Sequence, residues 1–188
     1  MHINHEIEFK TLISEEVFHK MSQDYPNAEI HDQTNTYYES TSCNMKEMGF
    51  AMRIRDLDGK HLFTMKQKAA QGHQEYELYL SENSAEALNH PELVKLFNHF
   101  HITGPFTSFG SLHTVRRSIH LNYGELCLDE NEYCGIKDYE IEFEIDVEHQ
   151  NEAQKEFNEL LSRYNITYTQ AKPKRTRCLL KMKEGQSS

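Results

Sequence analysis

The sequence predicts an α+β protein built on a closed, mainly antiparallel barrel of about eight strands with flanking helices. The first observation is a strict alternation over residues 139–148, where apolar Tyr, Ile, Phe and Val alternate with Glu and Asp. Because successive side chains of a strand point to opposite faces, one face is apolar and the other is a row of carboxylates. The second is that other predicted strands carry cations on the corresponding face. The third is a series of hairpin signals, among them Asp58-Gly59.

The N-terminal segment repeats this alternation on a smaller scale. Residues 2–13 are predicted to form a strand with Glu6, Glu8 and Lys10 on one face and apolar side chains on the other. Ser14 is expected to cap a short helix, because a serine hydroxyl can accept a hydrogen bond from a free amide of the first turn. Two acidic strands from opposite ends of the chain are thus expected to face the same space.

Residues 29–80 predict four more strands, which differ in the sign of their charged face. Two neighbouring strands joined by the Asp58-Gly59 turn are basic, and the strand after them is acidic through Glu75 and Glu77. Like charges on neighbouring strands repel, so a row of cations needs carboxylates or an anionic ligand opposite it. The expected strands cover residues 29–39, 50–55, 61–68 and 73–80, and their cations are Arg53, Arg55, Lys66 and Lys68.

The second half of the chain is expected to add helices and the remaining strands. A helical pair is predicted between Glu82 and Phe100, where the apolar residues change to a helical period. Strands are expected over 108–121 and 125–129. Asn151 is expected to cap an amphipathic helix that follows the carboxylate strand, residues 139–148. The charged positions of this half are Arg116, Asp129, Glu140, Glu142, Glu144, Lys172, Lys174, Arg175 and Arg177.

An open sheet with a solvated charged face is the alternative to a barrel. A solvated face usually mixes Lys and Glu irregularly. Here, by contrast, the charged face of each predicted strand is mostly acidic or mostly basic. Closing the sheet puts the charged face inside, where opposite signs and a charged ligand can neutralise one another, and helices then cover the apolar outside. We therefore expect a barrel with a polar interior.

Composition restricts the classes of function. The 188 residues carry a net charge of -10, which opposes non-specific binding to nucleic acid or anionic membrane. The four cysteines show no CxxC spacing, the twelve histidines form no HExxH motif, and no long apolar run occurs, so we expect a reduced, cytoplasmic protein. We expect one domain over residues 1–183, a disordered tail over 184–188, a monomer or homodimer, and no nucleic-acid or membrane partner.

The charged motifs form an ordered set that resembles the CYTH family, also called triphosphate tunnel metalloenzymes. The resemblance spans nearly the whole chain, and it departs from the family pattern at Glu39, where Asp is frequent, at His73, where Arg is frequent, and at Arg175, where Tyr is frequent. It implies an eight-stranded tunnel that binds a triphosphate with Mg²⁺ or Mn²⁺. The motifs are Glu6-x-Glu8-x-Lys10, Arg53-Ile54-Arg55, Lys66-Gln67-Lys68, Glu75-x-Glu77, Thr114-x-Arg116, Leu128-Asp129, Glu140-x-Glu142-x-Glu144 and Lys172-x-Lys174-x-x-Arg177.

The chemistry of phosphate and of hard cations agrees with this resemblance. Arg and Lys match phosphate oxygens, and carboxylate oxygens suit Mg²⁺ or Mn²⁺. The expected metal ligands are Glu6, Glu8, Glu140 and Glu142, with Asp129 and Glu144 as further ligands. The expected phosphate contacts are Lys10, Arg53, Arg55, Lys66, Lys68, Arg116, Lys172, Lys174 and Arg177. The expected catalytic set is Glu6, Glu8, Lys10, Lys66 and Asp129.

Three functions remain open from the sequence. The first is a triphosphatase acting on inorganic triphosphate, thiamine triphosphate or a nucleoside triphosphate. The second is a class IV-like adenylyl cyclase, which makes cyclic AMP from ATP, and the third is a non-catalytic sensor of polyphosphate or nucleotide. Tyr37, Tyr38 and Tyr133 are the obvious candidates for stacking on a base, although packing roles are expected for them. We expect most of the binding energy to come from the phosphates.

Overall fold

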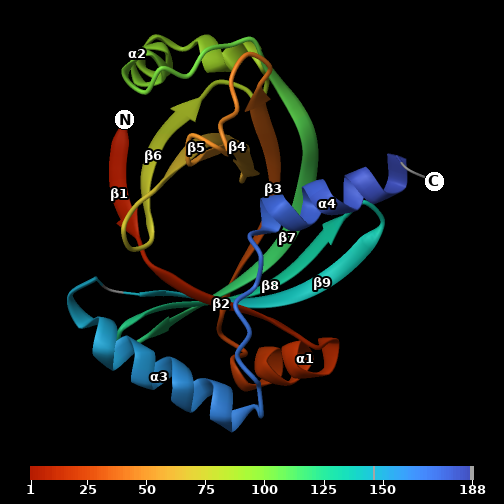
Figure 1. Cartoon of the computed structure of the whole chain (residues 1–188). Helices are drawn as coiled ribbons and strands as arrows, with labels where there is room; N and C mark the ends of the chain where they lie inside the picture. The colour runs from red at the N-terminus through yellow and green to blue at the C-terminus, as the bar shows by residue number, and fades with distance from the viewer. Residues whose placement is uncertain (146, 187–188) are drawn as a thin grey trace.

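Figure 1 shows the computed structural model, in which residues 1–145 and 147–186 are described. Their strands form one antiparallel sheet in the order β1-β6-β5-β4-β3-β7-β8-β9-β2, curled into a half-barrel. The strands are β1 (His2–Glu6), β2 (Glu8–Ile13), β3 (Glu29–Ser40), β4 (Phe50–Leu57), β5 (Lys60–Lys68), β6 (His73–Leu80), β7 (Phe106–Leu121), β8 (Gly124–Tyr133) and β9 (Ile136–Ile145). The helices are α1 (Glu15–Asp24), η1 (Glu86–Asn89), α2 (Pro91–His99), η2 (Val147–His149), α3 (Gln150–Arg163) and α4 (Lys174–Gln186).

The N-terminal strand is split at Ile7, which is why the eight predicted strands become nine. β1 pairs with β6 and β2 pairs with β9, at the two ends of the strand order. The carbonyl of Ile7 accepts a hydrogen bond of 2.9 Å from the amide of Ile145, so the break itself is held against β9. Because β1 and β2 are consecutive, the chain connects the two ends of the curled sheet, and Glu6 and Glu8 reach the same interior.

The predicted parity of the carboxylate strand is confirmed. Ile141 and Phe143 of β9 are fully buried in a cluster that α1 and α3 cover, and the ring of Phe157 in α3 stacks 5.4 Å from that of Phe9. A second cluster, which includes Ile54, lies beneath α2. Apolar side chains therefore pack outside the sheet against helices, and the charged side chains that alternate with them face inward.

The predicted helix boundaries were partly right. Ser14 caps α1, and its hydroxyl accepts a hydrogen bond of 3.3 Å from the amide of Val17. The helical pair is one 3₁₀ turn followed by α2, which starts at Pro91. The predicted cap at Asn151 was wrong, because α3 begins at Gln150 and His149, two residues before Asn151, occupies the N-cap position.

No helix was predicted for the C-terminal tail, yet α4 forms there and packs beside β7. Its first turn is basic and its sequence lacks an apolar period, because this turn packs into the charged interior and not onto a hydrophobic face. The tail expected over 184–188 overlaps α4, which runs to Gln186, and residues 187–188 lie outside the described part. None of the described helices is long and apolar enough to cross a membrane.

Candidate active site

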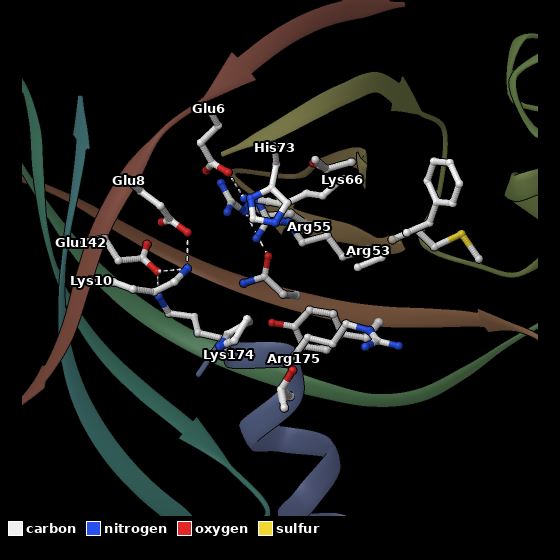
Figure 2. A pocket seen from close by; sticks show the side chains of 18 of the residues that line it. Glu6, Glu8, Lys10, Arg53, Arg55, Lys66, His73, Glu142, Lys174 and Arg175 are labelled. Carbon is white, nitrogen blue, oxygen red and sulfur yellow. Dashed lines mark hydrogen bonds and ion pairs between the residues drawn. The ribbon is translucent and has the colours of Figure 1, made fainter. Parts of the chain in front are cut away.

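The charged faces of the sheet and the first turn of α4 enclose a cavity of about 280 Å³. Figure 2 shows acidic side chains of the N-terminal strand and β9 on one side, basic side chains of β4 and β5 across from them, and two side chains of α4 below. The predicted site residues that line it are Glu6, Glu8, Lys10, Arg53, Arg55, Lys66, Lys68, Arg116, Glu142, Glu144 and Lys174. Those that do not line it are Asp129, Glu140, Lys172 and Arg177.

A carboxylate pair forms where β2 meets β9. Glu8 lies directly opposite Glu144, and Lys10 lies opposite Glu142. The ammonium of Lys10 forms an ion pair with Glu8 and lies 3.9 Å from a carboxylate oxygen of Glu142. Burial raises the pKa of Glu144, Arg116 opposes the rise, and the nearby carboxylates of Glu142, Glu6 and Glu8 add to it. Negative charge at this edge of the cavity is therefore not fully neutralised by the protein.

Lys66 of β5 links two carboxylates on the neighbouring strands. Its ammonium forms an ion pair with Glu6 of β1 and lies 2.8 Å from Glu75 of β6. Burial alone would lower the pKa of Lys66, but the two carboxylates outweigh burial and raise it. The sequence left the roles of Glu75 and Glu77 open. Glu75 is the second partner of Lys66, and Glu77 accepts a hydrogen bond of 3.3 Å from the hydroxyl of Thr64.

A dense ion-pair network joins α4 to β8 and β9. Asp129, Glu140 and Glu142 bring carboxylate oxygens within 4.8 Å of one another, a spacing that one cation can bridge. The ammonium of Lys174 lies 2.7 Å from Asp129, 2.8 Å from Glu140 and 2.7 Å from Glu142. Although burial opposes the shift, the neighbouring cations lower the pKa of Asp129 and hold that of Glu142 well below its ordinary value.

Two arginines complete this network. Arg116 of β7 donates two hydrogen bonds of 2.8 Å to Asp129, pairs with Glu142, and donates a bond of 3.2 Å to Glu144. Arg177 donates bonds of 3.0 to 3.2 Å to Asp138 and Glu140. A planar guanidinium that satisfies two carboxylates at once has little donor capacity left for a ligand. Asp129 and Glu140 are fully buried beneath the cavity within this network.

The cations of β4 differ from those of the network. Arg55 donates a bond of 3.1 Å to the amide oxygen of Asn35, and its pKa falls to about 9 because of burial and of the nearby charges of Arg53 and Arg116. The Nε atom of Arg53 is buried without a hydrogen-bond partner. Within the described residues, neither arginine forms an ion pair with a carboxylate. A bound anion would therefore stabilise the charged form of these two guanidinium groups.

The sequence did not identify every residue at the site. Arg175, Lys46 and His73 also line the cavity. Arg175 in the first turn of α4 pairs with Glu39, so two departures from the family pattern contact one another. Burial and the charge of Lys66 lower the pKa of His73. Of the expected phosphate contacts, Lys172 is exposed outside the cavity, where its carbonyl accepts a bond of 2.7 Å from Arg177.

Comparison with known proteins assigns the class to which this fold and site belong. The model of the CYTH domain matches residues 4–177, and the chain belongs to this family.

Particular relatives agree with this assignment. The chain is 33% identical over 175 residues to the Bacillus subtilis protein named "Putative triphosphatase YjbK", covering 90% of this chain and 91% of that protein. A crystal structure from Bacillus halodurans, described as a "putative adenylate cyclase", shares 32% identity and a TM-score of 0.83 over 94% of this chain and 98% of that one. HpAC1 from Hippeastrum, described as a "putative adenylyl cyclase" with a dominant triphosphatase activity, shares the fold at 20% identity, with a TM-score of 0.71 over 92% and 93%.

Proposed function

We propose that this chain is a divalent-metal-dependent triphosphatase that hydrolyses a phosphoric anhydride bond inside the cavity. One observation carries the proposal: Arg53 and Arg55, which lack carboxylate partners among the described residues, face a cavity whose opposite edge sets Glu144, with its raised pKa, against Glu8. An anion bridged by a divalent cation to carboxylates would satisfy both sides at once. The name and 33% identity of the Bacillus subtilis relative support the same activity.

The carboxylates fit Mg²⁺ or Mn²⁺, because they offer hard oxygen donors whose negative charge the protein does not fully balance. We assign Glu6, Glu8 and Glu144 as the principal ligands, with Glu142 shared between metal and Lys174. A bound divalent cation supplies charge neutralisation and polarises phosphoryl oxygens. Asp129 and Glu140, which the sequence also assigned as ligands, are proposed to hold Lys174, Arg116 and Arg177 in place.

The cations are proposed to fall into two groups. Arg53 and Arg55 bind the phosphoryl oxygens directly, and Lys68 adds charge at the mouth of the cavity. Lys10 and Lys66 position the carboxylates Glu8 and Glu6 through their ion pairs, and their remaining protons can reach substrate oxygens. Arg116 and Lys174 line the cavity but are saturated by carboxylates, so we propose supporting roles for them. Arg177 and Lys172 are proposed to make no phosphate contact.

Phosphoryl transfer depends mainly on positioning and on charge stabilisation. In this site the guanidinium groups of Arg53 and Arg55 would hold the chain of phosphates on one wall while Glu8 and Glu144 act from the other. Rigid strands set these side chains, because Arg53 lies opposite Thr64 and Arg55 opposite Leu62 in the β4–β5 ladder. No nucleophilic side chain is required if water attacks the terminal phosphorus.

The structure offers little for gripping a nucleobase. Tyr37 is 4% exposed and stacks on Phe109, Tyr38 is buried with its hydroxyl bonded to Asn83, and the hydroxyl of Tyr133 donates to Asp138. Tyr38 and Tyr133 are thus packed outside the cavity, and Tyr37 lines it with its ring held against Phe109. We therefore propose that the phosphates dominate recognition and that inorganic triphosphate is cleaved at least as well as ATP. The adenylyl cyclase activity remains the second candidate because the structure from Bacillus halodurans carries that description.

Product identification tests the proposal. The purified chain is incubated with inorganic triphosphate, ATP or thiamine triphosphate and Mg²⁺ or Mn²⁺, and phosphate and cyclic AMP are measured. We expect phosphate from inorganic triphosphate, no cyclic AMP, and no product in excess EDTA. Cyclic AMP from ATP would replace the hydrolase by a cyclase. Binding without any product would indicate a sensor. The Arg55→Gln variant serves as the control for a contaminating phosphatase.

The setting of the enzyme is also a proposal. All four cysteines are free thiols, which agrees with a reducing compartment, and we propose the cytoplasm. The partner is a small-molecule triphosphate.

A further inference from the structure

Two cysteines from distant parts of the chain lie side by side outside the cavity, and no step of the proposed hydrolysis uses them. Cys134 is exposed at the tip of the β8–β9 hairpin, and Cys178 is buried in α4. The β7–β8 ladder pairs His113 with Glu132, and continuing it by two residues places Ser111 opposite Cys134. The thiol of Cys178 lies 3.8 Å from the carbonyl oxygen of Ser111. Both cysteines therefore lie at the same end of the β7–β8 ladder.

The packing around α4 gives the same placement independently. Cys134 lines a small pocket together with Lys181 and Met182 of α4. Met182 follows Cys178 by four residues and so lies on the same helix face. Tyr133, next to Cys134, belongs to one buried cluster with Cys178 and Met182. Burial raises the pKa of Cys178 to about 11, and the adjacent thiol of Cys134 contributes through charge and a side-chain hydrogen bond.

The backbone at Cys134 is unusual for a cysteine. Cys134 has a φ of 49° and Gly135 a φ of 72°, so both central residues of this two-residue hairpin turn are in the left-handed region. Asn, Asp and Gly are the residues that favour such turns. A cysteine there is not explained by turn propensity, and unfavourable backbone conformations of this kind concentrate at functional positions.

We propose that Cys134 and Cys178 form a redox-active dithiol that closes to a disulfide and clamps α4 onto the β8–β9 hairpin. The oxidant is a low-molecular-weight disulfide such as oxidised glutathione. The exposed Cys134 thiolate attacks it, forming a mixed disulfide and releasing one glutathione thiolate. The Cys178 thiolate then attacks the Cys134 sulfur and releases the second glutathione. Two protein thiols are oxidised, one glutathione disulfide is reduced to two thiols, and the two protons go to the leaving thiolates.

The clamp would act on the part of α4 that reaches the cavity. Arg177, which holds Asp138 and Glu140, directly precedes Cys178, and Lys174 lies one turn earlier. The crosslink would join residues 134 and 178 and thereby keep these cations against β8 and β9. The inference does not depend on which triphosphate is hydrolysed, or on whether any is.

The test starts from the fully reduced chain, treated with oxidised glutathione near pH 8, then alkylated and analysed by mass spectrometry. We expect a mass about 2 Da lower, because two hydrogens leave, and alkylation of two of the four cysteines. Peptide mapping should place the bond between Cys134 and Cys178. The melting temperature should rise by about 5 °C or more and return to its starting value with dithiothreitol.

Variants separate this bond from non-specific oxidation. The wild-type Cys43 is a half-buried thiol near Thr103. The Cys43→Ser variant should therefore still form the crosslink between Cys134 and Cys178. Cys178→Ser should stop at one glutathione adduct on Cys134, and Cys134→Ser should resist oxidation. Four alkylated cysteines after oxidation, a crosslink through Cys43 or Cys127, or an adduct at Cys134 alone in the wild-type chain would overturn the inference. A crosslink between Cys134 and Cys178 that left the melting temperature unchanged would overturn the clamp.

Discussion

The two walls of the cavity carry the same kinds of cation but differ in how these cations are neutralised. On the β4 wall, Arg55 has only an amide partner among the described residues, and Arg53 has a buried Nε without one. On the α4 side, Lys174 lines the cavity and contacts three carboxylates at 2.7 to 2.8 Å, and Arg177, which does not line it, contacts two. Facing the interior is therefore not enough for ligand binding. A cation is available for an anion only when the protein has not already paired it.

The carboxylates divide in the same way. Asp129 and Glu140 are fully buried and each pairs with both Lys174 and an arginine. Glu8 and Glu144 face one another across two strands, and among the described residues each has a single cation partner, Lys10 and Arg116 respectively. The paired group is expected to stabilise the fold, because removing one member leaves an uncompensated buried charge. The under-neutralised group is expected to bind metal and to cost stability in its absence. Substitutions in the two groups are therefore expected to have opposite effects on stability.

The largest effect is expected for Arg55→Gln. Removing this guanidinium should lower kcat/KM for inorganic triphosphate by about a thousandfold, since two charge-assisted hydrogen bonds of about 2 kcal/mol each would be lost. The melting temperature should stay the same or rise, because the group is buried without a counter-ion. Steady-state phosphate release at saturating metal measures the first effect. Lys60→Gln on the exposed end of β5 is the matched control. A loss below fivefold would remove Arg55 from the binding wall.

Arg177→Met should produce the opposite pattern. Breaking its pairs with Asp138 and Glu140 should lower the free energy of unfolding by about 3 kcal/mol, which corresponds to a drop in melting temperature of about 10 °C. The KM of the folded fraction should change little. Urea unfolding followed by circular dichroism measures the loss, and Lys181→Met, which removes a surface pair with Glu184, is the matched control. Unchanged stability together with a large rise in KM would reverse the assignment of this wall.

Glu144→Gln should stabilise the metal-free protein at neutral pH. Because the pKa of Glu144 is raised above its ordinary 4.5, the folded protein binds this proton more tightly than the unfolded chain does. Ionisation of Glu144 therefore costs stability as the pH rises through its raised pKa. The stability gained by the Glu144→Gln substitution should be complete above the raised pKa of Glu144 and should vanish as the pH falls below 4.5.

Glu142→Gln provides the contrast, because the pKa of Glu142 is held well below its ordinary value. Its ionised form stabilises the fold, and that contribution is present above pH 4.5 and is lost as the pH falls through the lowered pKa. The substitution should thus destabilise the metal-free protein at neutral pH. Thermal unfolding in EDTA between pH 4 and 8 compares the two variants. Destabilisation by both substitutions at neutral pH would show that the 3.2 Å contact with Arg116 is enough to neutralise Glu144 as well.

The smallest effect is expected for Lys68→Gln. This lysine lines the mouth of the cavity but is exposed, so water and salt screen its charge. We expect a rise in KM of about threefold at low ionic strength that disappears near 0.5 M salt. Kinetics at two salt concentrations measure it. A rise above thirtyfold that survives high salt would make Lys68 a main phosphate contact.

The sequence predicted the fold and most of the charged side chains that line the cavity, because the alternation of faces along a strand is a local property. Once Ile141 and Phe143 face the helices, Glu142 and Glu144 must face inward. The break at Ile7 was missed because the alternation of residues 2–13 continues across it. α4 was missed because its first turn packs ion pairs, which leave no apolar period in the sequence.

The pairing of charges could not be predicted, because it depends on contacts between residues far apart in the chain. Nothing local distinguishes Arg177, saturated by Asp138 and Glu140, from Arg55, which lacks such partners among the residues described. The role of Glu75 depended likewise on its register with Lys66. The alternation along each strand shows which side chains face the charged interior. The register between strands and the packing of α4 determine which of these charges have no partner in the described part of the protein and are available to a ligand.

The most direct test of this division is calorimetric binding of inorganic triphosphate in EDTA, where turnover is not expected. Wild type, Arg55→Gln and Arg177→Gln are compared at a temperature at which circular dichroism shows all three folded. We predict that Arg55→Gln weakens binding by about thirtyfold or more, corresponding to about 2 kcal/mol, and that Arg177→Gln changes it by less than about threefold. Equal losses in the two variants, or a larger loss in Arg177→Gln, would contradict the account.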